Sequence, residues 1–517
     1  MTNPVPKLSR RTLLRATSAL GGAATVGTVG WLATAAGPAF AKTPAGLSGP
    51  AATAGRGMLA LARDMDGRLL LPGDDGFGMA STPNNGHFAH LQPRAVALCT
   101  TPADVQRCLR WATQHGMPFA VRSGGHSYAG FSTTPGLLIS VRHLRGVVID
   151  KANGTVTIQG GVNNQDMADV LRNHGVAVPS GRCPTVGASG LVLGGGWGFA
   201  ATRSGLTCDS LLTTDVVLAN SRLVQASSQQ QPDLFWAARG GGGGNFGVHT
   251  AFTFKLHEVG TVTKFNIVWQ PGKQVELLQA LQALQLQNPR SLSTRSKARP
   301  QKAGALPNRS DMLVESLGLY WGGKVALREL FAPLLSMQPT QVLDIQELPY
   351  WEARDQMVTD DPSGLYELRS SYVGQSISAD GLDTMLSWMG KWPGGALLQE
   401  NMGLFFAIGG AVNAVAVDAT AYAHRDSSFI FEQEAMWSPL DRPDVVRRQR
   451  EWLAAYYQAM QPYLQQRSYV NFPDRSMKDW AKRYYGSNLA RLSRVKRQYD
   501  PHNTFRFAQS IPLAQAF

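Results

Sequence analysis

A run of small residues at positions 181–198, GRCPTVGASGLVLGGGWG, limits most strongly how this chain can fold. Glycines remove the Cβ atoms that keep a backbone away from a ligand, and they leave successive N–H groups free to face phosphate oxygens. The apolar residues 191–193 and Trp197 favour a packed segment over a Gly-rich surface loop, the other interpretation of this composition. We therefore expect a cradle for a cofactor pyrophosphate, formed by Gly187, Gly190, Gly194, Gly195 and Gly196.

A second Gly-rich stretch, VRSGGHSYAG at residues 121–130, follows the apolar run 118–121. His126 comes directly after two glycines, so it is predicted to be presented at the end of a strand. A histidine in such a position is by itself more often an ordinary loop residue. Cys183 lies in the first Gly-rich run, however, and a histidine and a thiol in two such loops favour one shared site.

Together with the sequence YVNFPD at residues 469–474, these two stretches resemble the berberine-bridge-enzyme-like FAD oxidoreductases. The resemblance extends from about residue 90 to the C-terminus. It implies an α+β protein with the two-subdomain FAD-binding fold of the p-cresol-methylhydroxylase type. An inserted α/β substrate domain would cover the flavin with an antiparallel sheet. Members with both residues hold FAD by two covalent bonds, so His126 would bond the flavin 8α-methyl carbon and Cys183 would bond flavin C6.

The resemblance also implies the parts of the chain and the remaining cofactor contacts. The expected parts are an FAD-binding domain at 89–259, a substrate domain at 260–460, and a C-terminal segment at 461–517 that returns to the FAD domain, after an N-terminal segment at 42–88. Val186 is expected beside the flavin as a gate for dioxygen. The other expected cofactor-binding residues are Arg122, Ser123, Gly124, Gly125, Ser127, Asn245, Val248 and Asn471.

Local patterns predict a βαβ unit that delivers His126. An apolar strand at 95–99 is followed by Thr101 as N-cap and Pro102 at the first helical position, and Gly116 ends the helix. Further strands are predicted at 137–141, 147–150 and 156–159, with Asn153 and Gly154 as a hairpin turn. The FAD domain should continue with a helix at 164–173 and strands at 213–219, 222–226 and 249–256.

Residues 260–460 have a different texture, with predicted helices at 275–286 and 325–335 and a strand at 312–319. Because residues 287–309 are rich in basic residues, proline and glycine, we expect a solvated loop there. Strands at 403–408 and 411–417 are predicted to belong to the sheet over the flavin.

The chemistry requires a base, because a hydride leaves a carbon readily only when the proton on its oxygen or nitrogen is also removed. Plant members of the family often carry a glutamate on the strand that aligns with residues 410–417, where this chain has Ala414. We therefore expect Tyr469 to be the base and Tyr128 to be the second candidate. A tyrosine titrates near pKa 10 in water, so it needs cationic or hydrogen-bonding neighbours. Tyr469 as an ordinary amphipathic strand residue is the other interpretation.

These features predict an FAD-dependent oxidoreductase that oxidises an alcohol, a sugar hemiacetal or a related small molecule, with dioxygen as electron acceptor. Three alternatives remain open at this point. The first is a dehydrogenase that passes electrons to a quinone or cytochrome. The second is a natural-product tailoring enzyme. The third is a catalytically silent flavin-binding protein.

The first 41 residues have the pattern of a twin-arginine signal peptide, with Arg10 and Arg11 ahead of a moderately apolar run. An uncleaved N-terminal anchor is the alternative. Twin-arginine export carries folded proteins, as loading of a flavin before export would require. We thus expect the export machinery as a partner, a periplasmic or secreted protein, and no stable membrane insertion after cleavage.

Charge and cysteine content exclude other classes of protein. Removal of the signal peptide lowers the formal net charge from +13 to +9, spread over the chain, and nothing resembles a nucleic-acid-binding motif. Four cysteines do not make a disulfide framework, although Cys99 and Cys108 could pair or remain separate buried thiols. Since no Cys or His cluster has ligand spacing, a metal site is not expected.

Overall fold

The strands of this chain gather into three larger sheets and one small pair in the part that the structure describes. The structure is a computed structural model, and it describes residues 50–301, 307–358, 364–397 and 402–513. The predicted signal peptide at 1–41 lies outside the described residues. Residues 54–517 fall into one compact unit, and the following description concerns that unit.

The first sheet holds the loop that carries His126. Its order is β1-β2-β4-β3, and both β2 and β3 run parallel to β4. The predicted helix after β2 is confirmed, with Thr101 and Asp104 forming a capping box and proline in the first turn. The elements are α2 (Pro50–Asp64), β1 (Arg68–Leu70), α3 (Phe77–Ser81), η1 (Gly86–Phe88), β2 (Ala95–Leu98), α4 (Pro102–Gln114), β3 (Phe119–Arg122) and β4 (Leu137–Ser140).

The second sheet is antiparallel, with the order β5-β6-β10-β8-β9. Gly154 has a φ of 62° in the turn between β5 and β6, which is why glycine follows Asn153 there. The elements are β5 (Val147–Asp150), β6 (Thr155–Gln159), α5 (Asn164–Leu171), η2 (Arg172–His174), β7 (Val176–Ala177), α6 (Ala188–Leu193), α7 (Ala201–Ser204), η3 (Thr207–Ser210), β8 (Leu211–Val217), β9 (Leu223–Ser227), α8 (Pro232–Ala237), β10 (Val248–Lys255) and β11 (His257–Glu258). The short strand β11 pairs with β7.

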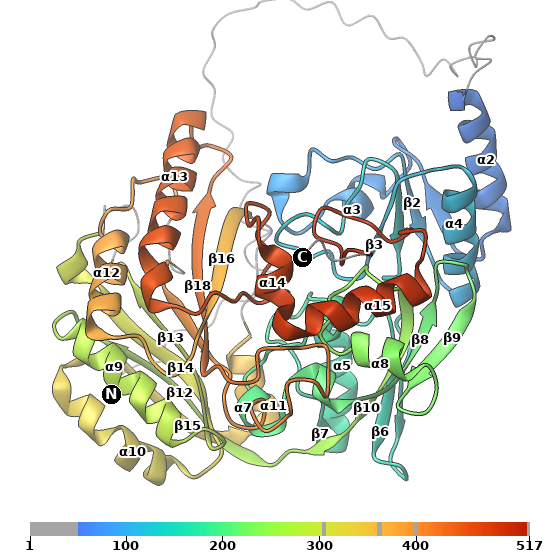
Figure 1. The fold of residues 1–517 in the computed structure, drawn as a ribbon. Helices are drawn as coiled ribbons and strands as arrows, with labels where there is room; N and C mark the ends of the chain where they lie inside the picture. The colour runs from blue at the N-terminus through green and yellow to red at the C-terminus, as the bar shows by residue number, and fades with distance from the viewer. Residues whose placement is uncertain (1–49, 302–306, 359–363, 398–401, 514–517) are drawn as a thin grey trace, which may run out of the picture. The chain divides into compact units, whose positions relative to one another are not determined.

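The third sheet has seven described strands in the order β15-β12-β14-β13-β17-β18-β16, all antiparallel to their neighbours. Helices α9, α10, α12 and α13 pack on one face of this sheet, where Leu278, Phe331, Met385 and Tyr456 belong to one apolar core (Figure 1). Burial of such side chains is the main stabilising contribution.

The bounds of this third group follow. The strands are β12 (Thr261–Trp269), β13 (Leu292–Arg299), β14 (Leu313–Tyr320), β15 (Thr340–Pro349), β16 (Leu365–Val373), β17 (Leu404–Ala407) and β18 (Phe429–Trp437). The helices are α9 (Gln274–Gln287), η4 (Arg309–Asp311), α10 (Lys324–Met337), α11 (Tyr350–Gln356), α12 (Ala379–Met389) and α13 (Pro443–Met460).

Two predictions for this region are wrong. In the range 287–309, the described residues 292–299 are not a solvated loop, because they form β13 in the middle of the sheet and seven of its eight residues are buried. Its basic side chains look solvated in sequence but lie on the sheet face opposite the helices. Residues 411–417 do not form a strand. They make turns after β17, and the chain re-enters the sheet only at β18.

The C-terminal segment contacts Asn245, which the sequence interpretation assigned to the FAD domain. It contains η5 (Gln461–Tyr463), α14 (Trp480–Tyr485), η6 (Gly486–Asn488) and α15 (Leu489–Tyr499). Lys496 is fully buried, and its Nζ donates to the Asn245 carbonyl at 2.7 Å and to Asp500 Oδ2 at 2.7 Å. Ile511 N donates to Asn245 Oδ1 at 2.9 Å, so Asn245 connects the C-terminal segment to a third Gly-rich stretch, the five glycines at residues 240–244.

Candidate active site

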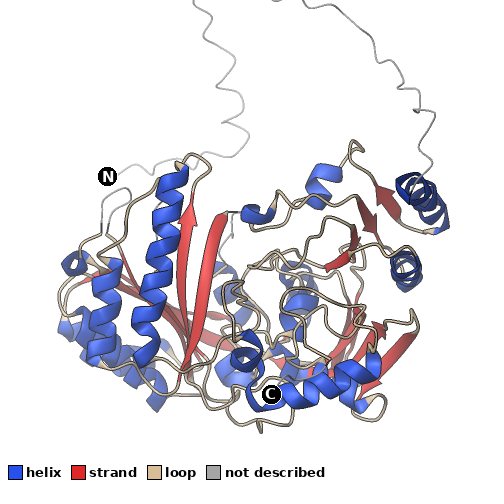
Figure 2. Ribbon diagram, turned by 45° about the horizontal axis from the view of Figure 1, so that its top comes forward, coloured by secondary structure: helices blue, strands red, loops and turns tan. Residues whose placement is uncertain are grey.

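The Gly-rich loop that carries His126 begins where β3 ends and lies directly against the Gly-rich loop that carries Cys183. A Cβ on Gly124 would be 2.2 Å from the Gly187 backbone nitrogen, and one on Gly187 would be 2.3 Å from the Gly124 nitrogen. No larger residue fits at either position without moving backbone. Figure 2 shows long stretches of loop and turn between the sheets, and residues 123–136 and 181–186 belong to such stretches. The two glycines therefore serve first to bring the two loops together.

His126 and Cys183 are brought to one cavity by this packing. His126 Nε2 lies 2.9 Å from Thr185 Oγ1, on the loop that carries Cys183. The Cys183 carbonyl accepts a hydrogen bond from Asn164 Nδ2 at 2.9 Å, which fixes the thiol-bearing turn to the start of α5. Cys183 is half-buried, whereas the other three cysteines are buried free thiols.

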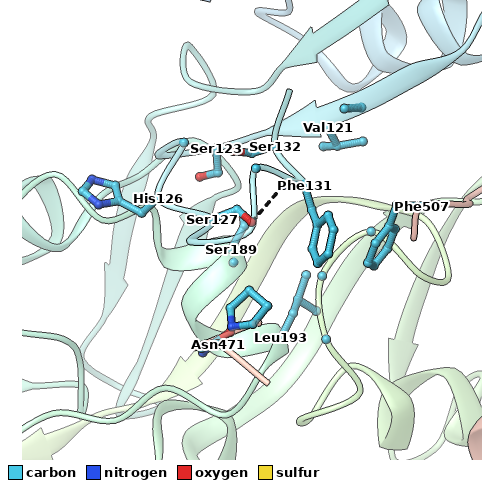
Figure 3. Close-up of a pocket in the computed structure, with 18 of the residues that line it drawn as sticks. Val121, Ser123, His126, Ser127, Phe131, Ser132, Ser189, Leu193, Asn471 and Phe507 are labelled. Atoms are coloured by element: carbon cyan, nitrogen blue, oxygen red, sulfur yellow. Dashed lines mark hydrogen bonds between the residues drawn. The ribbon is translucent and has the colours of Figure 1, made fainter. Parts of the chain in front are cut away.

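The cavity has a volume of about 890 Å³ and reaches from these loops to the third Gly-rich stretch and the C-terminal segment. Figure 3 shows Ser123, Ser127 and Ser189 grouped along one wall, with Phe131 and Phe507 side by side beyond them and His126 on the other side. The predicted site residues that line the cavity are Ser123, Gly124, Gly125, His126, Ser127, Tyr128, Cys183, Val186, Gly187, Gly190, Asn245, Val248, Tyr469 and Asn471.

Arg122 has a different environment from the expected one. Its guanidinium is buried and donates to the backbone carbonyls of Ser132, Ala80 and Thr82, at 2.8, 2.8 and 3.1 Å. Burial lowers the pKa of Arg122 to about 10. Among the described residues, Arg122 is not one that lines the cavity. It braces the loop from behind instead of facing the cofactor.

The three consecutive glycines also differ from the prediction of a phosphate cradle. A Cβ on Gly194 would be 2.1 Å from Asn471 Oδ1, and one on Gly196 would be 2.3 Å from Thr207 Oγ1. Gly195 packs against Tyr422. These glycines allow close packing within the protein, and they are not among the described residues that line the cavity. The sequence pattern could not separate approach to a ligand from approach to another part of the chain.

Tyr469 is almost fully buried beside this turn. Its Oη accepts hydrogen bonds from the backbone nitrogens of Gly196 and Trp197 at 3.0 and 3.1 Å, and from Asn471 Nδ2 at 3.1 Å. Three donors favour the phenolate, but burial has the larger effect and raises the pKa of Tyr469 to about 12. The tyrosine is therefore neutral at ordinary pH, and it holds the Gly196–Trp197 turn.

The cavity is also lined by two carboxylates that the sequence interpretation missed. Glu432 and Glu434 lie two residues apart on β18, so both point to the same face, and both line the cavity while being largely buried. The sequence interpretation compared a glutamate of plant relatives with Ala414 on an expected strand, but residues 411–417 form turns and β18 is the strand that reaches the cavity. Alternation of charge in FEQE was the available signal.

The glutamates share their sheet with buried cations. Across the ladders Lys297 pairs with Leu404 and Leu404 pairs with Glu432, which places them on one face. Arg295 lies on this face too, opposite Phe406, which lines the cavity. Burial and the positive charge of Arg182 together lower the pKa of Arg295 to about 10, although the charge of Glu432 opposes this shift. The wall thus carries interacting charges of both signs.

The cavity is suited to a flat, elongated cofactor that needs backbone contact. A Cβ on Gly190 would meet no atom within 4 Å, although Gly190 lies on the wall. The same wall includes Gly243 and Gly244, where the nearest atoms to a Cβ are 3.9 and 3.6 Å away. Protein atoms therefore do not crowd these three glycines, and the absence of side chains leaves this part of the cavity open. The residues present therefore fit a cofactor between the loops.

Comparison with known proteins agrees with this geometry. Residues 93–227 match the FAD binding domain, and residues 468–512 match the family described as berberine and berberine like. The FAD-linked oxidoreductase YvdP of Bacillus subtilis is 33% identical over 455 residues, which cover 87% of this chain and 98% of that protein. The chain belongs to the berberine-bridge-enzyme-like FAD-dependent oxidoreductases.

Solved structures of berberine-bridge-enzyme-like proteins share the whole architecture. The wild-type berberine-bridge-enzyme-like protein 1 of Physcomitrella patens has a TM-score of 0.79 at 28% identity, covering 89% of this chain and 99% of that one. The xylooligosaccharide oxidase of Myceliophthora thermophila, in complex with xylobiose, has a TM-score of 0.76 at 26% identity and covers 89% and 100%. This berberine-bridge-enzyme-like protein therefore has the two-subdomain FAD-binding fold of the p-cresol-methylhydroxylase type, and FAD is its cofactor.

The names of two relatives indicate a class of substrate. Oligosaccharide oxidases are among the relatives, so small-molecule substrates belong to the range of this berberine-bridge-enzyme-like family. Within the described residues, the helices all lack the combination of length and apolar character that crossing a bilayer requires.

Proposed function

We propose that the protein oxidises a hydroxyl-bearing carbon of a small molecule, an alcohol or a sugar hemiacetal, and that Glu432 removes the hydroxyl proton. The observation that carries this proposal is the composition of the cavity: both Gly-rich loops form one wall, and Glu432 of β18 lies on the other. FAD, when bound, supplies a hydride acceptor at N5. Sugar oxidation by two relatives supports the carbohydrate class.

The protonation states favour Glu432 over Tyr469 as the base. The charges of Glu432 and Arg295 interact, and a nearby positive charge favours the ionised carboxylate that a base requires. Tyr469, with a pKa raised by burial to about 12, would have to lose its own proton first. Its hydrogen bonds to the Gly196 and Trp197 nitrogens suit a residue that shapes the cavity. Tyr469 as the base stays a prediction that a variant can test.

The enzyme's function is tested by anaerobic titration of the purified protein with xylobiose, chitobiose and primary alcohols. Bleaching of the flavin absorbance by one of these compounds supports the proposal. If none bleaches the flavin but an alkaloid does, the protein is a natural-product tailoring enzyme. Flavin that no compound reduces would make it a silent flavin-binding protein and contradict the proposal.

His126 and Cys183 are proposed as two independent points of covalent attachment. They belong to different loops. The hydrogen bond between His126 and Thr185 holds these loops together and does not involve Cys183 Sγ, the atom that would attach to the flavin. Acid-precipitated wild type should keep its yellow colour in the pellet. His126→Ala and Cys183→Ala should each still retain flavin, and release of all flavin from the wild type would contradict both assignments.

Dioxygen is the proposed electron acceptor, with Val186 as a small gate. Val186 lines the cavity next to the Cys183 turn, where its carbonyl accepts a hydrogen bond from Asn164 N at 3.0 Å. Val186→Leu should slow reoxidation of the flavin by air far more than its reduction by substrate. Equal slowing of both steps would remove the gate. Turnover with a dye or quinone but without peroxide in air would identify a dehydrogenase.

Export by the twin-arginine route is proposed from residues 1–41 alone, with a periplasmic or secreted enzyme as the result. Replacement of Arg10 and Arg11 by lysine should leave the flavin-loaded precursor inside the cell. Fractionation followed by the colour of the denatured protein measures this. Unchanged export of the lysine variant would contradict the route.

A further inference from the structure

A short segment before the FAD domain connects the His126 loop to the sheet that covers it. We call residues 84–86 the asparagine clip. Asn84 N donates to the Gly125 carbonyl at 3.1 Å, next to His126 in the chain. Gly86 N donates to the Gly364 carbonyl at 2.7 Å, just before β16 begins. The clip therefore contacts both walls of the cavity through backbone hydrogen bonds.

Asn85 makes the central connection. It is fully buried, and its Nδ2 donates to the Tyr128 carbonyl and to the Tyr366 carbonyl, each at 3.0 Å. Its Oδ1 accepts from His87 N at 3.1 Å. A buried amide is costly unless its donors and acceptor are all used, and here they are. Only a side chain with two donors and one acceptor at this length can join these groups.

The two residues that Asn85 joins also touch each other in the cavity region. The rings of Tyr128 and Tyr366 meet edge to face with centroids 5.4 Å apart. Tyr128 is stacked on Phe472 at 5.3 Å with an interplanar angle of 27°. Tyr128 and Phe472 line the cavity. Leu368, two residues after Tyr366 on β16, also lines it, as does Glu434, with which Leu368 pairs across the sheet. The ring of Tyr128 is thus fixed from two sides, while its backbone is fixed by Asn85.

A second contact holds the far end of the same loop. Phe88, just after the clip, packs on Gly130, where a Cβ would lie only 2.4 Å from the Phe88 ring. Tyr366 Oη also donates to Asn84 Oδ1 at 3.3 Å. Residues 125–130 are therefore held along their length by one short segment that is itself outside the family-model match at 93–227.

We infer that Asn85 is a positioning residue for substrate binding: it sets the Tyr128 ring against a ring-shaped substrate by tying the His126 loop to β16. The inference rests on the proposed function for the identity of the substrate, a sugar ring or another hydroxyl-bearing ring. Aromatic rings held at fixed positions give such a substrate flat contact area. A group that contacts the substrate binds it more weakly when it is misplaced, so a loosened clip should be measurable as a higher KM.

The test uses the flavin-loaded enzyme and xylobiose. Asn85→Leu has a similar shape but leaves the Tyr128 and Tyr366 carbonyls without their amide donor. We expect the KM for xylobiose to rise about tenfold, with the limiting rate of flavin reduction within threefold of wild type and the covalent flavin retained. In a Tyr128→Ala background the same substitution should change KM less than twofold, because Asn85 acts through Tyr128.

Asn488→Leu is the matched control. Asn488 is also a buried asparagine whose Nδ2 donates to backbone carbonyls, those of Val417, Thr420 and Ala421, and it does not line the cavity. It should lower the melting temperature as Asn85→Leu does while leaving KM unchanged. Equal KM values for Asn85→Leu and wild type, or full additivity with Tyr128→Ala, would overturn the inference.

A failure of the substrate class can be told apart from a failure of the clip. If xylobiose does not reduce the flavin of the wild type, the carbohydrate proposal falls. The clip is then judged by amide hydrogen exchange, which should accelerate at least tenfold in residues 125–130 of Asn85→Leu and stay unchanged there in Asn488→Leu. Unchanged exchange in residues 125–130 of Asn85→Leu would overturn the clip without reference to any substrate.

Discussion

The two walls of the cavity are built in different ways. The wall formed by the Gly-rich loops depends on backbone. Gly124 and Gly187 pack so closely that neither has room for a Cβ, and Gly190 leaves space where no protein atom lies. The wall formed by the seven-stranded sheet depends on side chains, with Glu432 and Glu434 set by the alternation of β18. We therefore expect the cofactor wall, formed by the loops, to be shared by many enzymes of one fold and the sheet wall to select the molecule that reacts.

The largest effect should come from the sheet wall. Glu432→Gln keeps the shape but removes the proton acceptor, so the limiting rate of anaerobic flavin reduction should fall by roughly 10² to 10⁴-fold with flavin content unchanged. Stopped-flow absorbance measures it. Glu434→Gln is the matched control, two residues along the same strand, and should cost less than tenfold. Equal effects of the two substitutions would contradict a specific role for Glu432.

On the cofactor wall, a pair of glycines separates packing between the loops from contact with FAD. Gly124→Ala forces a Cβ to 2.2 Å from the Gly187 nitrogen. Overpacking typically costs about 1–3 kcal/mol, and because a backbone atom must move here, we expect a loss of stability above that range and little folded protein. Gly190→Ala has no protein atom to meet and lies within α6, where alanine favours the helix by about 1 kcal/mol.

The apoprotein of Gly190→Ala should therefore melt no lower than wild type, yet it should bind FAD more weakly. Thermal melting with and without added FAD measures both properties. Normal flavin loading by Gly190→Ala would show that the cofactor does not approach this glycine, and the distinction between the two walls would lose its basis there.

A smaller effect is expected from Tyr469. Tyr469→Phe leaves the buried nitrogens of Gly196 and Trp197 without their acceptor, which should cost about 1–3 kcal/mol of stability, while flavin reduction slows less than tenfold. Urea unfolding and stopped-flow reduction give the two numbers. A hundredfold slower reduction with unchanged stability would return the role of base to Tyr469 and leave the sheet wall without it.

The sequence predicted the backbone wall better than the side-chain wall, for physical reasons. The Thr101 cap, the parallel strands around α4 and the packing of the two loops follow from local patterns and glycine spacing. By contrast, Arg295 and Lys297 look solvated in sequence, because only pairing with β14 and β17 buries them.

Glycine spacing also has a limit as a signal. It predicted that the chain approaches something closely at Gly194 to Gly196, but Asn471 and Thr207, distant in sequence, turned out to be the neighbours. Likewise Glu432 and Glu434 could be assigned to the cavity only once the register of β18 with β16 and β17 was known. The alternation in FEQE indicates a strand with a charged face, but it does not say which strands pair with it or which cavity that face lines.

The central claim, that a carboxylate of the sheet wall accepts the proton, is tested most directly by the pH dependence of the flavin reduction rate at saturating substrate. At pH values below its pKa of about 12, the ionised fraction of Tyr469 rises tenfold for each unit by which the pH increases. With Glu432 as base the rate should be flat between pH 7 and 10 and fall only at acidic pH. A tenfold rise per unit from pH 7 to 10, abolished in Tyr469→Phe, would contradict the account.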